Sequence, residues 1–107
     1  MIHDLVKATL EQTTLPVSFH RYSGEAPTYI TFHQIGENAV LNADDTERAT
    51  SHLYQVNLFS LQDYEESVNA IKSYMAEIGA TRLNEIEFFD DAGWYQRSIR
   101  FRINTFT

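Results

Sequence analysis

The sequence predicts a single α+β domain spanning residues 1–107, in which an antiparallel sheet of about four to five strands carries two helices on one face. Two observations predict this fold. Residues 53–59 alternate as a strand does and run through a very short turn into an amphipathic helix, and most of the remaining chain is strand-like. With 43% hydrophobic and 13% aromatic residues, a chain of this length has enough apolar surface for one core.

The first predicted element is a helix over residues 2–13, which Pro16 follows and ends. Its apolar residues recur near a helical period: Ile2, Leu5, Val6 and Leu10. A short strand is expected over residues 17–22, with Val17 and Phe19 on one face.

Two longer strands are expected in the middle of the chain. Residues 29–35 are rich in β-branched and aromatic side chains, residues 36–38 are either a bulge or a break, and residues 39–42 are compatible with an extension. A polar loop then leads to a strand over residues 46–59. One face of this strand is apolar, with Tyr54, Val56 and Leu58, whereas the other is mixed and expected to be partly covered.

The second helix carries an apolar stripe of Val68, Ile71, Met75 and Ile78. Ser60-Leu61-Gln62-Asp63 resembles a capping box at its start, and Gly79 is the natural residue after its end. Two strands follow, over residues 83–89 and 94–106, joined by a hairpin loop at residues 90–93 with its glycine near the end.

The composition argues against several classes of partner, cross-link and targeting segment. A net charge of −7 argues against nucleic acid or an anionic membrane surface as the main partner. The absence of cysteine excludes disulfides and thiolate chemistry. No apolar run approaches the roughly 20 residues of a membrane helix, and the N-terminus lacks the apolar region of a signal peptide.

The histidines do not form a recognisable metal-binding pattern. No pair among His3, His20, His33 and His52 has helix-face spacing. Neighbouring strands could bring His33 and His52 together, so a metal site stays open as an alternative. We favour isolated strand histidines and expect neither a metal nor a cofactor.

Two acidic segments are expected to be solvated loops. Asp44, Asp45 and Glu47 form one, and Asp90 and Asp91 form the other. Neither has the glycine and terminal glutamate of an EF-hand loop. The functional alternative is a charged loop tip that fits a partner subunit.

The last strand carries the main basic residues of interest. Arg100 and Arg102 share a strand face, where they could meet phosphates or pair with Glu85 and Glu87 on the preceding strand; we favour the ion pairs. Trp94 follows the hairpin loop and is either an exposed contact anchor or an ordinary core residue.

No motif indicates an enzyme. The chain has no nucleophile elbow, phosphate-binding glycine loop or dinucleotide fingerprint, and it has only four glycines. A small domain with ample scaffold and no evident reactive site is expected to act by contact.

The order of elements resembles the tail-completion, or tail-terminator, proteins of long-tailed bacteriophages and prophages. The similarity runs over nearly the whole chain, from the N-terminal helix and Leu15-Pro16-Val17 to the final pair of strands. Its most specific parts are the Pro27-Thr28-Tyr29-Ile30 strand and the Tyr54-Gln55-Val56 strand that leads through Ser60 directly into a helix.

This resemblance implies a virion structural protein of the tail or neck, synthesised in the host cytoplasm, that forms a homo-oligomeric, typically hexameric, ring. The ring caps the tail tube and docks the head connector, so the expected partners are the protein itself, the tail tube protein and the head–tail connector. The residues expected at contacts are Asp44, Asp45, Glu47, Trp94, Arg100 and Arg102.

Three alternatives remain. The chain could be another neck, connector or minor tail protein, or an adaptor domain outside phages. A small hydrolase or metal-dependent enzyme built on the strand histidines is the alternative from a different class.

Overall fold

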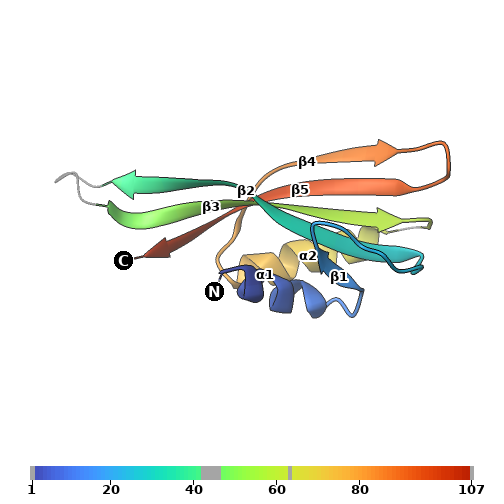
Figure 1. Cartoon of the computed structure of the whole chain (residues 1–107), viewed down its shortest axis with the longest axis horizontal. Helices are drawn as coiled ribbons and strands as arrows, with labels where there is room; N and C mark the ends of the chain where they lie inside the picture. The colour runs from blue at the N-terminus through green and yellow to red at the C-terminus, as the bar shows by residue number, and fades with distance from the viewer. Residues whose placement is uncertain (1, 42–46, 63, 107) are drawn as a thin grey trace.

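The computed structural model describes residues 2–41, 47–62 and 64–106, without the side chains of residues 40, 41, 47 and 48. Its elements are α1 (Ile2–Glu11), β1 (Val17–Phe19), β2 (Thr28–Leu41), β3 (Glu47–Ser60), α2 (Glu65–Glu77), β4 (Thr81–Phe89) and β5 (Tyr95–Phe106). Both helices lie on the same side of the sheet (Figure 1). The expected α+β class and element order are confirmed.

The strands form one five-stranded sheet in the order β1-β2-β3-β5-β4. The pairs β2–β3, β3–β5 and β4–β5 are antiparallel, as expected. The edge strand β1 instead runs parallel to β2, with Val17 opposite Ile30, so the sheet is mixed. The expected antiparallel sheet therefore holds for the pairs among β2, β3, β4 and β5, whereas β1 departs from it, because the direction of an edge strand depends on the path of the loop that joins it to its neighbour.

The core lies between the helices and the facing side of the sheet. Side chains from α1, α2 and the three central strands form one buried cluster: Val6, Leu10, Ile30, Phe32, Tyr54, Val56, Leu58, Tyr64, Val68, Ile71, Met75, Ile99, Phe101 and Ile103. The predicted apolar faces of β3 and α2 are thereby confirmed. In α1, however, Leu5 is 43% exposed, and Thr9 lies buried beside Val6 and Leu10.

The ends of α2 show one success and one failure of the sequence prediction. At the C-terminus Gly79 has φ 83°, and the amides of Gly79 and Ala80 donate to the carbonyls of Ala76 and Met75 at 3.0 and 3.1 Å. This is the Schellman arrangement expected for a glycine after the helix. At the N-terminus the helix begins at Glu65, so Ser60 is not its cap, and the cap residue Tyr64 makes no side-chain capping bond; Asp63 of the predicted capping box lies outside the described residues.

Ser60 has a different role from the predicted cap. It is the last residue of β3, and its hydroxyl bonds to the Thr28 hydroxyl at 2.9 Å and accepts from the Gln62 amide at 3.2 Å. These bonds hold the strand–helix junction against the start of β2.

Of the two alternatives left open for residues 36–38, a bulge or a break, the structure shows a bulge: the register shifts between Gln34 and Gly36, and the strand continues to Leu41. Beyond this bulge, β2 and β3 continue as a long arm, together with the C-terminal end of β5, past the end of the helix layer (Figure 1). The arm gives the molecule its elongated extents of 53 × 23 × 23 Å.

Candidate interaction surface

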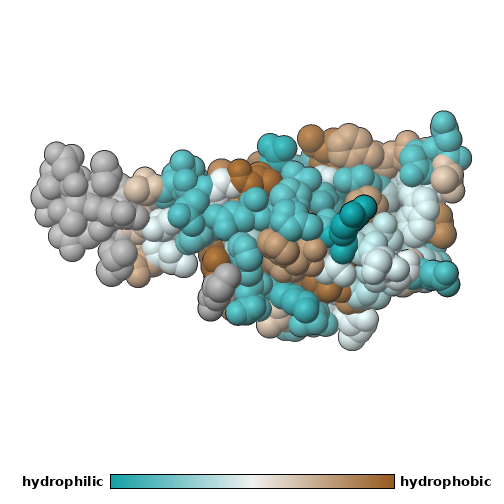
Figure 2. All heavy atoms as spheres, in the orientation of Figure 1, coloured by the Kyte–Doolittle hydropathy of each residue, from teal (hydrophilic) through white to brown (hydrophobic). Residues whose placement is uncertain are grey.

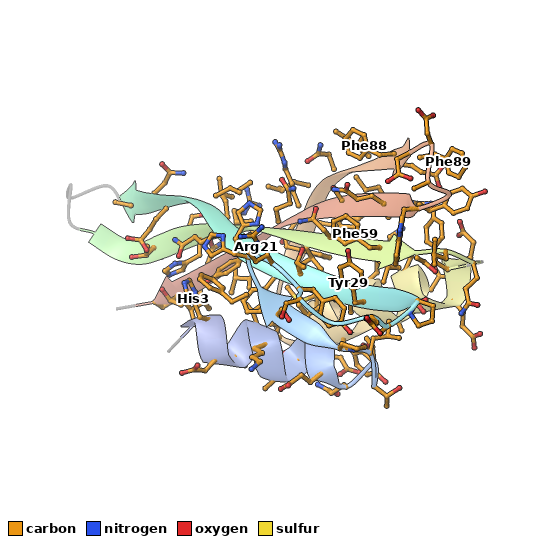
Figure 3. The ribbon with its side chains drawn as sticks, turned by 45° about the vertical axis from the view of Figure 1, so that its right-hand side comes forward. His3, Arg21, Tyr29, Phe59, Phe88 and Phe89 are labelled. Carbon is orange, nitrogen blue, oxygen red and sulfur yellow. The ribbon has the colours of Figure 1, made fainter. Side chains whose placement is uncertain are left out.

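One side of the sheet carries no helix, and we call it the open face. It is lined by alternate residues of the central strands, including Tyr29 and Thr31 of β2, Asn57 and Phe59 of β3, and Ser98 of β5. Figure 3 shows Tyr29 and Phe59 side by side on their strands. The mixed second face that we predicted for β3 is this surface.

Aromatic rings gather at one end of the open face. The ring of Tyr29 stacks on Tyr22 and Phe59, at centroid distances of 4.3 and 4.9 Å, and meets Trp94 edge-on at 5.6 Å. These rings are half-buried rather than enclosed. Trp94 is therefore neither a freely exposed anchor nor a core residue, but part of a partly accessible aromatic cluster.

Next to the aromatic cluster lies a network of polar side chains. The Asn57 carboxamide oxygen accepts from the Ser98 hydroxyl at 2.6 Å and from the Gln55 amide at 3.0 Å, and its nitrogen donates to the Thr31 hydroxyl at 3.3 Å. Asn57 and Ser98 are almost fully buried. Because its members bond to one another, this network forms a firm polar surface.

Arg100 and Arg102 extend from β5 on the same face, opposite Gln55 and Leu53 of β3. Both side chains are exposed, and within the described part of the chain neither forms an ion pair. The open face carries these cations and, toward the hairpin end, the aromatic cluster; none of the described residues that β2, β3, β4 and β5 place on it is acidic. It is therefore locally basic on a protein of net charge −7.

The predicted ion pairs of Arg100 and Arg102 with Glu85 and Glu87 were wrong. The hairpin pairs Phe89 with Tyr95, which places Glu87 opposite Arg97 and Glu85 opposite Ile99, on the helix side of the sheet. Arg97 forms ion pairs with both glutamates, at 2.5 Å from Glu85 and 3.6 Å from Glu87, and with Glu65 of α2 at 3.3 Å. Strand alternation from the hairpin end could have identified Arg97 from the sequence.

Glu85 is the centre of this ion cluster. Lys72 of α2 lies 2.7 Å from its carboxylate, and Arg82 and Arg97 also donate to it. Burial alone would raise the pKa of Glu85, but the hydrogen bonds from Lys72, Arg97 and Arg82 outweigh it and lower the pKa to about 2. The cluster fastens α2 to the outer strand β4.

The histidines do not converge. His33 lies on the open face and stacks on His20 at 5.4 Å, whereas His52 lies on the helix side, 3.0 Å from the Thr105 hydroxyl and 3.2 Å from Glu37. His3 of α1 contacts the hydroxyl of Tyr54. The alternative in which neighbouring strands bring His33 and His52 together is contradicted, because the two side chains lie on opposite faces of the sheet. In the described residues no group of three or more His, Cys, Asp or Glu side chains could hold a metal ion.

The other expected contact residues cannot be placed on this surface. Asp44 and Asp45 lie outside the described residues, and Glu47 begins β3 opposite Leu41, with its side chain outside them as well.

Among the helices that the structure describes, none is long and apolar enough to span a membrane.

The fold itself has a known counterpart. A chain in the solved structure described as the virion of a native gene transfer agent particle superposes with a TM-score of 0.59 at 14% sequence identity. The match covers 94% of this chain and 86% of that chain. No protein-family model and no curated protein matches the sequence. At this identity the similarity establishes a shared fold.

Proposed function

We propose that this protein is a structural component of a phage-like virion, and more specifically a tail terminator that forms a ring, caps the tail tube and docks the head connector. The observation that carries the proposal is the fold shared with a chain of a virion particle over 94% of the sequence. The independent resemblance of its strand order and junction motifs to tail-terminator proteins supports the finer assignment.

The surfaces of the molecule suit such a role. A ring subunit needs two unlike surfaces for its neighbours and a further surface for the proteins above and below the ring. The open face has the composition of a docking surface, because aromatic rings and arginines are enriched where proteins meet. We assign it to contact with the tail tube or the connector, with Trp94, Arg100 and Arg102 among the contact residues.

The first test is the solution mass of the purified protein, measured by light scattering over a concentration series, with electron micrographs of any large species. We expect closed rings of about six subunits, or a smaller species that joins the ends of tail tubes when tubes are added. A monomer that ignores tail tubes would refute the tail-terminator assignment and favour an adaptor domain.

A second measurement tests the open face. The double variant Arg100→Glu, Arg102→Glu reverses two exposed charges that make no ion pair within the described residues, so the fold should be retained. We expect weaker binding to tubes or connector, whereas the control Lys7→Glu on α1 should bind as the wild type does. Equal binding by all three proteins would remove the open face from the docking role.

A further inference from the structure

Strand β4 forms one edge of the sheet and carries four exposed large apolar side chains, which we call the apolar row. Leu83, Ile86, Phe88 and Phe89 are 45%, 46%, 50% and 63% exposed. Ile86 and Phe88 lie on the open face, opposite Ser98 and Gln96, whereas Phe89 lies opposite Tyr95 on the helix side. In the space-filling view an apolar patch lies along the upper margin over β4, and the side-chain view shows Phe88 and Phe89 near the hairpin end of that strand (Figures 2 and 3). The Phe89 ring contacts the Tyr95 ring at a centroid distance of 4.7 Å. Exposure of several large apolar side chains along one strand marks a contact surface.

The edge is also poorly protected against pairing. Natural edge strands are usually shortened, bulged, or furnished with lysine or proline. β4 has nine residues without lysine or proline, and its one register shift lies near its start, between Arg82 and Asn84. Its acidic residue Glu85 is paired with Lys72, Arg82 and Arg97, and Glu87 lies 3.6 Å from Arg97.

The same chain carries a second open strand edge. β1 pairs only with Ile30, Thr31 and Phe32, so within the described residues the outer edge of β2 has no partner strand over residues 33–41. This segment is also nine residues long and contains neither lysine nor proline, and its register shifts lie near its two ends, between Gln34 and Gly36 and between Val40 and Leu41. It includes Ile35, which is 40% exposed. Each edge spans about 30 Å.

We propose that β4 of one copy pairs with residues 33–41 of β2 in a second copy, which extends the sheet from one subunit to the next. The two edges match in length, and pairing them would satisfy outward-facing main-chain groups on both strands and cover the apolar row of β4. The occupant is a second copy because the chain itself supplies the matching edge. The inference deepens the self-association that the proposed function requires.

Cysteine cross-linking tests the pairing directly, because the natural chain contains no cysteine. Ile86 and Asn38 lie on the open face, opposite Ser98 and Ser51 within their own copy, and each stands one residue past the centre of its edge. Single variants Ile86→Cys and Asn38→Cys are mixed and treated with a cross-linker that spans about 8 Å, which reaches direct and diagonal partners.

We expect a cross-linked dimer when both variants are present and at most a trace with either alone. The control pairs Ile86→Cys with Leu5→Cys on α1, whose exposure of 43% matches the 46% of Ile86. Two outcomes would overturn the proposed pairing and leave the proposed function intact. One is a control pair that cross-links at the same yield. The other is a sample that self-associates but gives no cross-linked dimer between Ile86→Cys and Asn38→Cys.

A second variant tests the apolar row. Phe88→Lys should weaken self-association at least about tenfold, the effect of losing one well-buried contact side chain, while circular dichroism stays unchanged. Leu5→Lys, an exposed leucine on α1, should have no effect. Unchanged association of the Phe88 variant, or a wild type that never self-associates, overturns the inference; binding to tail tubes then decides the proposed function separately.

Discussion

Replacement of Glu85 by glutamine would test how the outer strand is attached to the rest of the molecule. Glutamine keeps the shape of the side chain and removes its charge. The change leaves Lys72, Arg82 and Arg97 without the carboxylate on which they converge. Arg97 is the most affected, because its side chain is only 16% exposed and retains only the more distant Glu65 and Glu87.

The magnitude follows from the pKa of Glu85, which falls from 4.5 to about 2. At about 1.4 kcal/mol per pKa unit, this corresponds to at most about 3.5 kcal/mol of stabilisation of the folded state. The side chain is 18% exposed, so solvent screens part of the interaction. We therefore expect Glu85→Gln to lower the free energy of unfolding by about 1–2 kcal/mol at neutral pH.

Urea denaturation at a series of pH values measures this free energy. Because the pKa of Glu85 is lower in the folded state than in the unfolded chain, its contribution is present above pH 4.5 and is lost as the pH falls toward about 2. The difference between wild type and Glu85→Gln should therefore shrink over that interval.

The matched control is Glu87→Gln on the same strand. Glu87 is 53% exposed and lies 3.6 Å from Arg97, so its loss should cost less than about 0.5 kcal/mol. The reasoning fails if the two variants are equally stable, or if the Glu85 variant differs from wild type by the same amount at neutral and acidic pH.

Two further predictions concern aromatic residues. Tyr29→Ala removes the ring that meets Trp94 edge-on. We therefore expect a red shift in the fluorescence emission of this single tryptophan and a loss of about 1 kcal/mol in stability. Unchanged emission would show that the ring does not shield Trp94. For Tyr54, burial and the nearby Glu37 raise the pKa from 10.0 to about 12. The neutral phenol therefore stabilises the fold fully below pH 10, and this contribution is lost as the pH rises toward 12. An ultraviolet titration of the folded protein measures this pKa. Ionisation of Tyr54 near its ordinary pKa would contradict the prediction.

The sequence by itself determined those features that depend on local pattern. Alternation along β3 identified the buried Tyr54, Val56 and Leu58, and helical spacing identified the buried stripe of α2. Gly79 was predictable because only glycine readily adopts the positive φ that ends such a helix. These signals are local because a residue's side of a strand or helix follows from its neighbours in the chain.

The tertiary structure alone decided which residues meet across the sheet. The hairpin register placed Glu85 and Glu87 beside Arg97 and left Arg100 and Arg102 on the open face. The register between β2 and β3 sets His33 opposite Gln55, and alternation along β3 from Gln55 puts His52 on the other face. The parallel direction of β1 and the exposure of β4 likewise depend on neighbours distant in sequence. The reason is physical: a shift of one residue in register reverses the face of every side chain, and composition does not record that shift.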